Sequence, residues 1–268
     1  MLFLAGLTNL PPAEKMNLRF PAQFQQLLIL GSLFFLTTRV ARAQQDAEAV
    51  IAGKSTRIKV VSIVGNSLMI KTEFGDQGVP LSTISEIRMA PPGEFSSGMQ
   101  AYQEKDYPKA LALIRSVTDR FRGLPVDWAK TASVVLVEIS LAMNDIQKAD
   151  LEFSALLRAY PTGNSLQGDL LTARIALAKK NFALAKQKVT PIAEAALKDK
   201  APNFTTSPIY GQAFLISGQV KESDGQFASA LEDYLRTVTI FYQDRTVALQ
   251  AQERADALRL QHPEISIP

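Results

Sequence analysis

The chain contains no cysteine, one histidine and one tryptophan among its 268 residues. Without cysteine it forms no disulfide and carries no lipid-modified amino-terminal cysteine, so burial of apolar side chains must supply its stability. With His262 as the single histidine, the folded body offers no histidine cluster for zinc and no Ser-His-Asp triad. We therefore expect a protein that is not an enzyme and that holds no metal and no cofactor.

The chain also lacks an apolar run of the roughly 20 residues that a membrane-spanning helix needs. Residues 27–36 are apolar but too few; they follow Arg19 and precede Ala41-Arg42-Ala43, a small-x-small cleavage site. This order predicts a signal peptide over residues 1–43, and its proportions favour a start at Met16. We expect a periplasmic or secreted protein with no stable membrane insertion after leader removal; an uncleaved membrane anchor is the alternative.

Clustered positive charge is missing as well. The whole chain has 29 basic and 26 acidic side chains, but residues 1–43 hold four of the basic and one of the acidic ones. Residues 44–268 therefore carry 25 of each. Nucleic-acid binding depends on clustered Lys and Arg that displace counterions from phosphate, so we expect no nucleic-acid partner. The short basic run at 198–200 is most simply a solvated helix end.

After the leader, we interpret residues 44–52 as a linker and residues 53–92 as a small β module. Residues 55–64 are rich in branched side chains, and residues 68–74 follow a Gly65-Asn66 turn, which predicts a hairpin.

A second turn is expected at residues 75–78, followed by one or two short strands within 79–89 in which Ile84 and Ile87 face inward. This order of strands and turns resembles small Sm-like or SH3-like barrels. Such a module has exposed edges, which makes self-association through the β module an alternative to consider.

From residue 93 onward the sequence pattern is typical of helices. One motif, which we call the phrase, occurs four times: a polar turn, an apolar residue and an alanine three positions after that residue. The alanines are 39, 36 and 45 residues apart. Positions four and seven beyond each alanine are largely apolar, as expected for one helix face. The four phrases are Tyr107-Pro-Lys-Ala110, Ile146-Gln-Lys-Ala149, Phe182-Ala-Leu-Ala185 and Phe227-Ala-Ser-Ala230.

Nine residues before each apolar residue, the first helix of the unit carries Gly98, Val137, Ala173 or Gly218. Three of these four are small enough to let two helices approach closely.

These residues resemble the tetratricopeptide repeat family over residues 95 to about 262. The resemblance implies two antiparallel helices per unit, stacked into an array in which each hairpin buries its apolar face on the next. Residues 244–260 fit a further capping helix, with Val247, Ala251, Ala255 and Leu258 on its apolar face. An irregular helical bundle with alanine in its seams is the alternative.

The predicted fold is therefore α+β: a small β-barrel-like module followed by an α-helical solenoid of four hairpins and a capping helix over 93–262, with a tail at 263–268. The family resemblance implies a scaffold or adaptor of the bacterial cell envelope that holds a protein or peptide partner against the first helices. Mapped onto this chain, that surface comprises Met99, Tyr102, Glu138, Leu141, Arg174, Leu177, Gln219 and Glu222.

The apolar members of this set could equally be stacking contacts between units. Two other functions stay open: a structural subunit that self-assembles through the β module, and an accessory subunit of an envelope enzyme complex.

Overall fold

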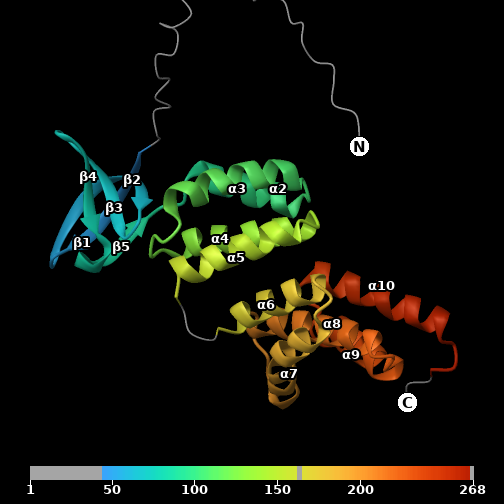
Figure 1. Cartoon of the computed structure of the whole chain (residues 1–268). Helices are drawn as coiled ribbons and strands as arrows, with labels where there is room; N and C mark the ends of the chain where they lie inside the picture. The colour runs from blue at the N-terminus through green and yellow to red at the C-terminus, as the bar shows by residue number, and fades with distance from the viewer. Residues whose placement is uncertain (1–43, 162–164, 266–268) are drawn as a thin grey trace, which may run out of the picture. The chain divides into compact units, whose positions relative to one another are not determined.

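The computed structural model describes residues 44–161 and 165–265, which form a five-stranded sheet followed by paired helices (Figure 1). The predicted leader, 1–43, lies outside the described residues, as does the end of the tail. This arrangement confirms the predicted α+β fold. The strands are β1 Gln45–Ile51, β2 Lys54–Val64, β3 Ser67–Thr72, β4 Gly75–Pro80 and β5 Ile84–Met89.

The sheet is antiparallel, and its strand order is β4-β3-β2-β1-β5. In the described part of the chain β4 and β5 are its two edges, so the sheet is open and not a closed barrel. The hairpin of β2 and β3 turns at Gly65-Asn66, as predicted. Ile87 is buried and Ile84 packs against the same core, so both face inward.

Two sequence predictions in this module are wrong. Residues 44–52 form strand β1 and are not a linker: Ala47 and Ala49 are buried while Asp46 and Glu48 are exposed. Buried and exposed residues do alternate with the period of two that is typical of a strand. The pattern was not recognised in the sequence because the buried residues are alanines, which are weak strand formers. The second turn lies at residues 73–74 and not at 75–78, which belong to β4. Glycine is tolerated there because β4 is an edge strand.

Nine α-helices follow within the described residues, and eight of them pair as the hairpins α2/α3, α4/α5, α6/α7 and α8/α9. Helix α10 comes last. Their bounds are α2 Gly93–Gln103, α3 Tyr107–Phe121, α4 Asp127–Ala142, α5 Ile146–Ala159, α6 Leu166–Ala178, α7 Phe182–Lys198, α8 Thr206–Ser223, α9 Phe227–Thr239 and α10 Arg245–Gln261.

Each hairpin closes with the same turn. The residue before each second helix's N-cap has a positive φ, and the chain around it makes the two backbone hydrogen bonds of a Schellman motif. In the first hairpin Asp106 N donates to Ala101 O and Lys105 N donates to Tyr102 O, at 2.9 and 3.1 Å. The left-handed residues are Lys105, Asn144, Lys180 and Gly225.

The repeated alanines lie at the centres of these hairpins. Ala110, Ala149, Ala185 and Ala230 are all fully buried. The side chains four and seven positions later are buried too, which confirms the predicted inner face of each second helix. They are Ile114 and Val117, Phe153 and Leu156, Val189 and Ile192, and Tyr234 and Thr237.

Small residues on the first helices admit those side chains. A Cβ built on Gly98 would lie 2.8 Å from Ile114 Cδ1, and one on Gly218 would lie 2.7 Å from Tyr234 Cδ1. Both distances are far below a normal carbon–carbon contact, so only glycine fits between the paired helices at these positions.

Trp128 connects the sheet to the first helices. Its ring packs against Phe95 and Phe121, with ring centroids 6.0 and 5.4 Å apart, and its Nε1 donates to the Met89 carbonyl of β5 at 2.9 Å. A single apolar cluster contains side chains of the sheet and of α2, α3 and α4. The β module is therefore stabilised by the first hairpin, as its small size requires.

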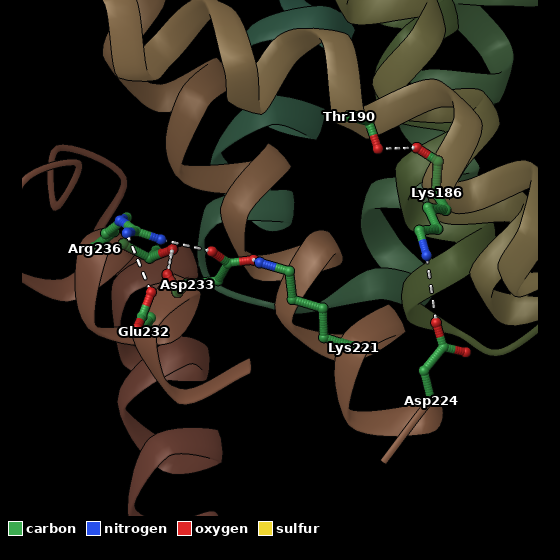
Figure 2. A network of polar contacts seen from close by, with 8 residues as sticks. Lys186, Thr190, Lys221, Asp224, Glu232, Asp233 and Arg236 are labelled. Carbon is green, nitrogen blue, oxygen red and sulfur yellow. Dashed lines mark hydrogen bonds and ion pairs between the residues drawn. The ribbon is translucent and has the colours of Figure 1, made fainter. Parts of the chain in front are cut away.

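The last hairpin is held by a buried ionic network (Figure 2). Asp233 on α9 is 1% exposed and accepts hydrogen bonds from Lys221 Nζ of α8 at 2.6 Å and from Arg236 at 3.0 Å. On the neighbouring unit, Lys186 reaches Asp224 in the α8–α9 turn at 3.6 Å. These pairs fix α8 against α9 and connect this hairpin to the preceding one.

Helix α10 covers the final apolar face, as predicted. Val247, Ala251, Ala255 and Leu258 are buried against α8 and α9. The opposite side of the helix is exposed and mostly polar, with Leu249 and Leu260 exposed among the polar side chains. This pattern is that of a capping element, which a stack of hairpins needs at its end.

Candidate partner-binding groove

The first helix of every unit contributes to one groove of about 800 Å³. Because the hairpins repeat in register, the carboxyl-terminal halves of α2, α4 and α6 present side chains to the same space, and α8 and α10 complete it. The lining residues are Tyr102, Gln103, Lys105, Tyr107, Glu138, Leu141, Arg174, Leu177, Ala178, Gln212, Leu215, Ile216, Gln219, Asp244, Thr246, Val247 and Gln250.

Six of the eight residues proposed from the sequence line this groove. They come from four successive first helices: Tyr102, Glu138, Leu141, Arg174, Leu177 and Gln219. The other two do not line it. Met99 packs against the core formed by the sheet and the first hairpins. Glu222 accepts a hydrogen bond from the Tyr234 hydroxyl at 2.6 Å and pairs with Arg254 at 3.3 Å, so it connects α8 to α9 and α10.

Glu138 is the polar centre of the groove. Its Oε2 accepts a hydrogen bond from the Tyr102 hydroxyl at 2.8 Å, and its Oε1 accepts one from Arg174 Nη1 at 2.9 Å. The three side chains belong to α2, α4 and α6, so one carboxylate connects three units. Burial, with the Glu138 charge beside it, raises the pKa of Tyr102 above its ordinary value. The phenol therefore stays protonated at neutral pH and continues to donate.

The groove is formally neutral. Its charged side chains are Glu138, Asp244, Lys105 and Arg174, two of each sign. Asp244 is used within the fold, because its carboxylate accepts from the backbone N–H groups of Thr246 and of the residue after it, at the start of α10.

Four glutamines face the groove, one on α2, two on α8 and one on α10. In the part of the chain that the structure describes, no hydrogen bond engages the side-chain amides of Gln103, Gln212, Gln219 and Gln250. Each such amide offers one acceptor and two hydrogens to donate, which is what the backbone of an extended polypeptide requires. The apolar side chains between them provide surface for its side chains.

Sequence reasoning missed the contributions of α8 and α10, chiefly Gln212, Leu215, Ile216 and Gln250. One signal was available: Gln212 and Gln219 are seven residues apart and share a helix face. The placement of α10 beside that face depends on how the cap stacks, and no local pattern encodes it.

A second hollow, of about 1460 Å³, lies on the sheet beside Trp128. Its lining includes the apolar Ile58, Ile87 and Met89, with side chains of both charges around them. It lies between the sheet and the start of α4, and it was not predicted from the sequence.

Within 44–161 and 165–265 there is no group of three His, Asp or Glu side chains placed to hold a metal ion. In those ranges no helix combines the length and the hydropathy that crossing a bilayer requires.

No protein-family model matches the chain, and no curated protein matches its sequence. Among solved structures it is similar to MamA 41-end from Desulfovibrio magneticus RS-1, with 14% sequence identity and a TM-score of 0.39. That match covers 66% of this chain and 100% of the other. The likeness is too distant to support an argument about function, which depends here on the geometry of the groove.

Proposed function

We propose that this protein is a non-enzymatic interaction scaffold that binds a protein segment in the groove formed by its first helices. The observation that supports this proposal is the groove itself: the first helices of all four hairpins and the capping helix α10 contribute to one hollow of about 800 Å³. A hollow built by repetition is elongated along the array and suits a chain better than a compact metabolite.

The chemistry of the lining defines the partner further. Balanced charge gives little long-range attraction for a strongly acidic or basic ligand. Unpaired glutamine amides and apolar side chains instead suit an extended, largely uncharged segment, whose backbone they would hydrogen-bond. We expect this partner to be a protein or peptide, with no cofactor and no nucleic acid involved.

The proposal also includes the compartment in which the protein acts. The features of residues 1–43 that predict a leader support export. We propose that the scaffold works in a bacterial cell envelope, in the periplasm or as a secreted protein.

Affinity capture tests the groove directly. The variant carries E138Q and R174M together, because removing both members of the pair leaves no unpaired charge and glutamine can still accept from Tyr102. We expect capture of envelope proteins to fall at least tenfold while the thermal unfolding temperature stays nearly unchanged.

The matched control is D150N with K179M. Asp150 and Lys179 also connect two units, at 2.8 Å, but they lie outside the groove and are about half exposed. This control should capture the same proteins as the unmodified chain. Equal capture by both variants would contradict the proposed groove, and loss of folding in the first variant would mean that Glu138 is a stacking residue only.

A second function, self-assembly as a structural subunit, is favoured by one observation. Strands β4 and β5 are the two edges of the sheet in the described residues, and an edge offers unpaired backbone groups to another strand. Size-exclusion chromatography with light scattering distinguishes the two functions: a monomer supports the scaffold, whereas a ring or filament supports self-assembly.

A further inference from the structure

The register of the sheet determines which backbone groups of the edge strand β5 lack a partner. The β1–β2 hairpin closes at the pair of Ile51 and Lys54, across a two-residue turn with positive φ at both positions. Such a closing pair is hydrogen-bonded, so alternate residues of β1 bond to β2. The residues between them, Glu48 and Val50, therefore direct their backbone groups toward β5.

Ile87 is left with a free N–H and a free carbonyl. Its neighbours Glu86 and Arg88 face Val50 and Glu48 of β1, so the backbone groups of Ile87 point the other way, toward the open edge. The carbonyl of Met89, which points to the same side, accepts from Trp128 Nε1 at 2.9 Å. For Ile87 the described residues provide no such partner outside the sheet. The residue is only 8% exposed, so an unpaired backbone there costs stability.

The other edge strand, β4, is less suited to pairing. Its hairpin with β3 closes at Thr72 and Gly75, so the residues that direct backbone groups outward are Asp76, Gly78 and Pro80. Proline has no N–H to donate, and glycine weakens a strand. Of the two edges, β5 therefore offers the better template for a further strand.

The exposed face of β5 carries one charge of each sign. Glu86 and Arg88 are exposed, lie on the same face and pair with each other at 2.6 Å. When a second copy of β5 is laid antiparallel with Ile87 opposite Ile87, Glu86 of each copy lies opposite Arg88 of the other. A register two residues away places Glu86 opposite Glu86, or Arg88 opposite Arg88, and like charges repel. A shift of one residue puts the outward backbone groups out of phase. Charge and hydrogen bonding thus favour one register.

The charges of the neighbouring strands continue this alternation. Glu48 of β1 lies opposite Arg88, and it pairs with Arg57 of β2 at 3.5 Å. Across the two joined sheets one row would read Arg57, Glu48, Arg88 and then Glu86 of the second copy. No like charges are adjacent in this row, so the second copy is accepted without repulsion from the strands behind the edge.

The other face of β5 borders the hollow of about 1460 Å³ beside the sheet. Ile87 and Met89 line this hollow together with Ile58 and Trp128. In the register that the charges favour, Ile87 of the second copy lies directly opposite Ile87 on this apolar face. Pairing therefore removes apolar surface from water at the joint as well as satisfying the backbone.

We propose that β5 pairs antiparallel with β5 of a second copy, about a two-fold axis at Ile87, and joins the two sheets into one. The contact is small, so the dimer is weak and depends on concentration. A strand of another protein would find the same backbone groups, but a copy of this chain carries the matching charges by symmetry. A two-fold pair is closed, unlike a ring or filament. The inference does not rest on the proposed groove, which is lined by helices.

Cysteine crosslinking tests the register with residues 44–268, which form one compact unit. The chain contains no cysteine, so each introduced thiol is the single one. Facing residues of a non-hydrogen-bonded pair have Cβ atoms about 4.5–5.5 Å apart, close enough for a disulfide after a small adjustment. A mixture of E86C protein and R88C protein should form a disulfide-linked dimer on mild oxidation. Either protein alone should crosslink at least tenfold less, and equal crosslinking by E86C alone would overturn the register.

Light scattering over a concentration series tests the dimer itself. The unmodified protein should reach twice the monomer mass, and E86R should weaken the dimer at least tenfold because two arginines then face each other. The swap E86R with R88E should restore it in part, since the signs are exchanged on both copies while Glu48 still lies beside position 88.

The matched control is D76K on the other edge, where Asp76 pairs with Lys71 at 3.0 Å as Glu86 does with Arg88. It should dimerise as the unmodified protein does. Because Glu86, Arg88 and Asp76 are exposed, circular dichroism melts should be alike. Three results would overturn the proposal: a monomer at every concentration, an unchanged dimer in E86R, or an equal loss in D76K.

Discussion

Replacing Gly218 with alanine is the sharpest test of the helix packing. Gly218 faces the ring of Tyr234, and an added Cβ would lie 2.7 Å from its Cδ1 and 3.0 Å from its Cζ. The ring cannot move aside, because it is fully buried and its hydroxyl is bonded to Glu222 at 2.6 Å. The added methyl group must therefore strain the contact between α8 and α9.

The expected magnitude follows from two opposing effects. Alanine in place of glycine inside a helix gains about 1 kcal/mol of helix propensity. Overpacking a rigid core costs about 1–3 kcal/mol, and the immobile ring puts Gly218→Ala at the upper end. We expect a net loss of about 2 kcal/mol in the free energy of unfolding, measured by urea denaturation followed by circular dichroism. At this chain length that corresponds to a fall of roughly 4–8 °C in the melting temperature.

Two controls make the result specific. Gly93→Ala, at the start of α2 with open space around the new methyl group, should change stability by less than about 0.5 kcal/mol. Tyr234→Leu removes the ring, so adding Gly218→Ala to that variant should cost nothing further. A Gly218→Ala protein as stable as the unmodified one would refute the close approach of the paired helices.

Three further results are expected. Asp233→Ala leaves two cations around a buried position, so it should lower the free energy of unfolding by about 3 kcal/mol in urea titrations, and a loss below about 1 kcal/mol would contradict the network. Lys180 has a positive φ that glycine adopts without strain, so Lys180→Gly should raise the free energy of unfolding by about 0.5–1 kcal/mol. Gly225→Ala introduces the same strain and should lower the free energy of unfolding by about 1 kcal/mol. A change of the same sign in both variants would disprove the shared turn. Burial raises the pKa of Tyr234 above its ordinary 10.0, so stability holds below about pH 10 and falls as pH rises further. Tyr234→Phe should reduce that alkaline slope by about 1.4 kcal/mol per pH unit, and an unchanged slope would count against the burial of the phenol.

The features predicted correctly from the sequence are those set by neighbouring residues. The hairpin turns depend on a short polar segment and the N-cap after it, and the buried faces depend on spacing within one helix. Strand β1 was missed because its inward residues, Ala47 and Ala49, are not strand formers. The turn predicted at 75–78 was wrong because glycine there serves an edge strand.

The groove residues also divide into those that spacing within one unit predicts and those that depend on packing between helices. Side chains such as Glu138 and Arg174 could be placed from the repeat register alone, because equivalent positions of stacked helices face the same side. Glu222 occupies the equivalent position on α8 but is drawn into the seam by Tyr234 and Arg254. Whether a side chain faces the groove or the contact between two helices depends on the residues of the next helix. The spacing within one unit does not contain that information.

Site-specific photo-crosslinking tests the central claim most directly. A photoreactive phenylalanine analogue is placed at Gln219, in the groove, and in a second protein at Leu151, which is 71% exposed on α5 and lies outside the groove. Irradiation in an envelope fraction should produce one discrete adduct from position 219 and none from position 151, and E138Q with R174M should abolish it. An adduct from position 151 with none from position 219 would show that the partner binds elsewhere and would contradict the groove.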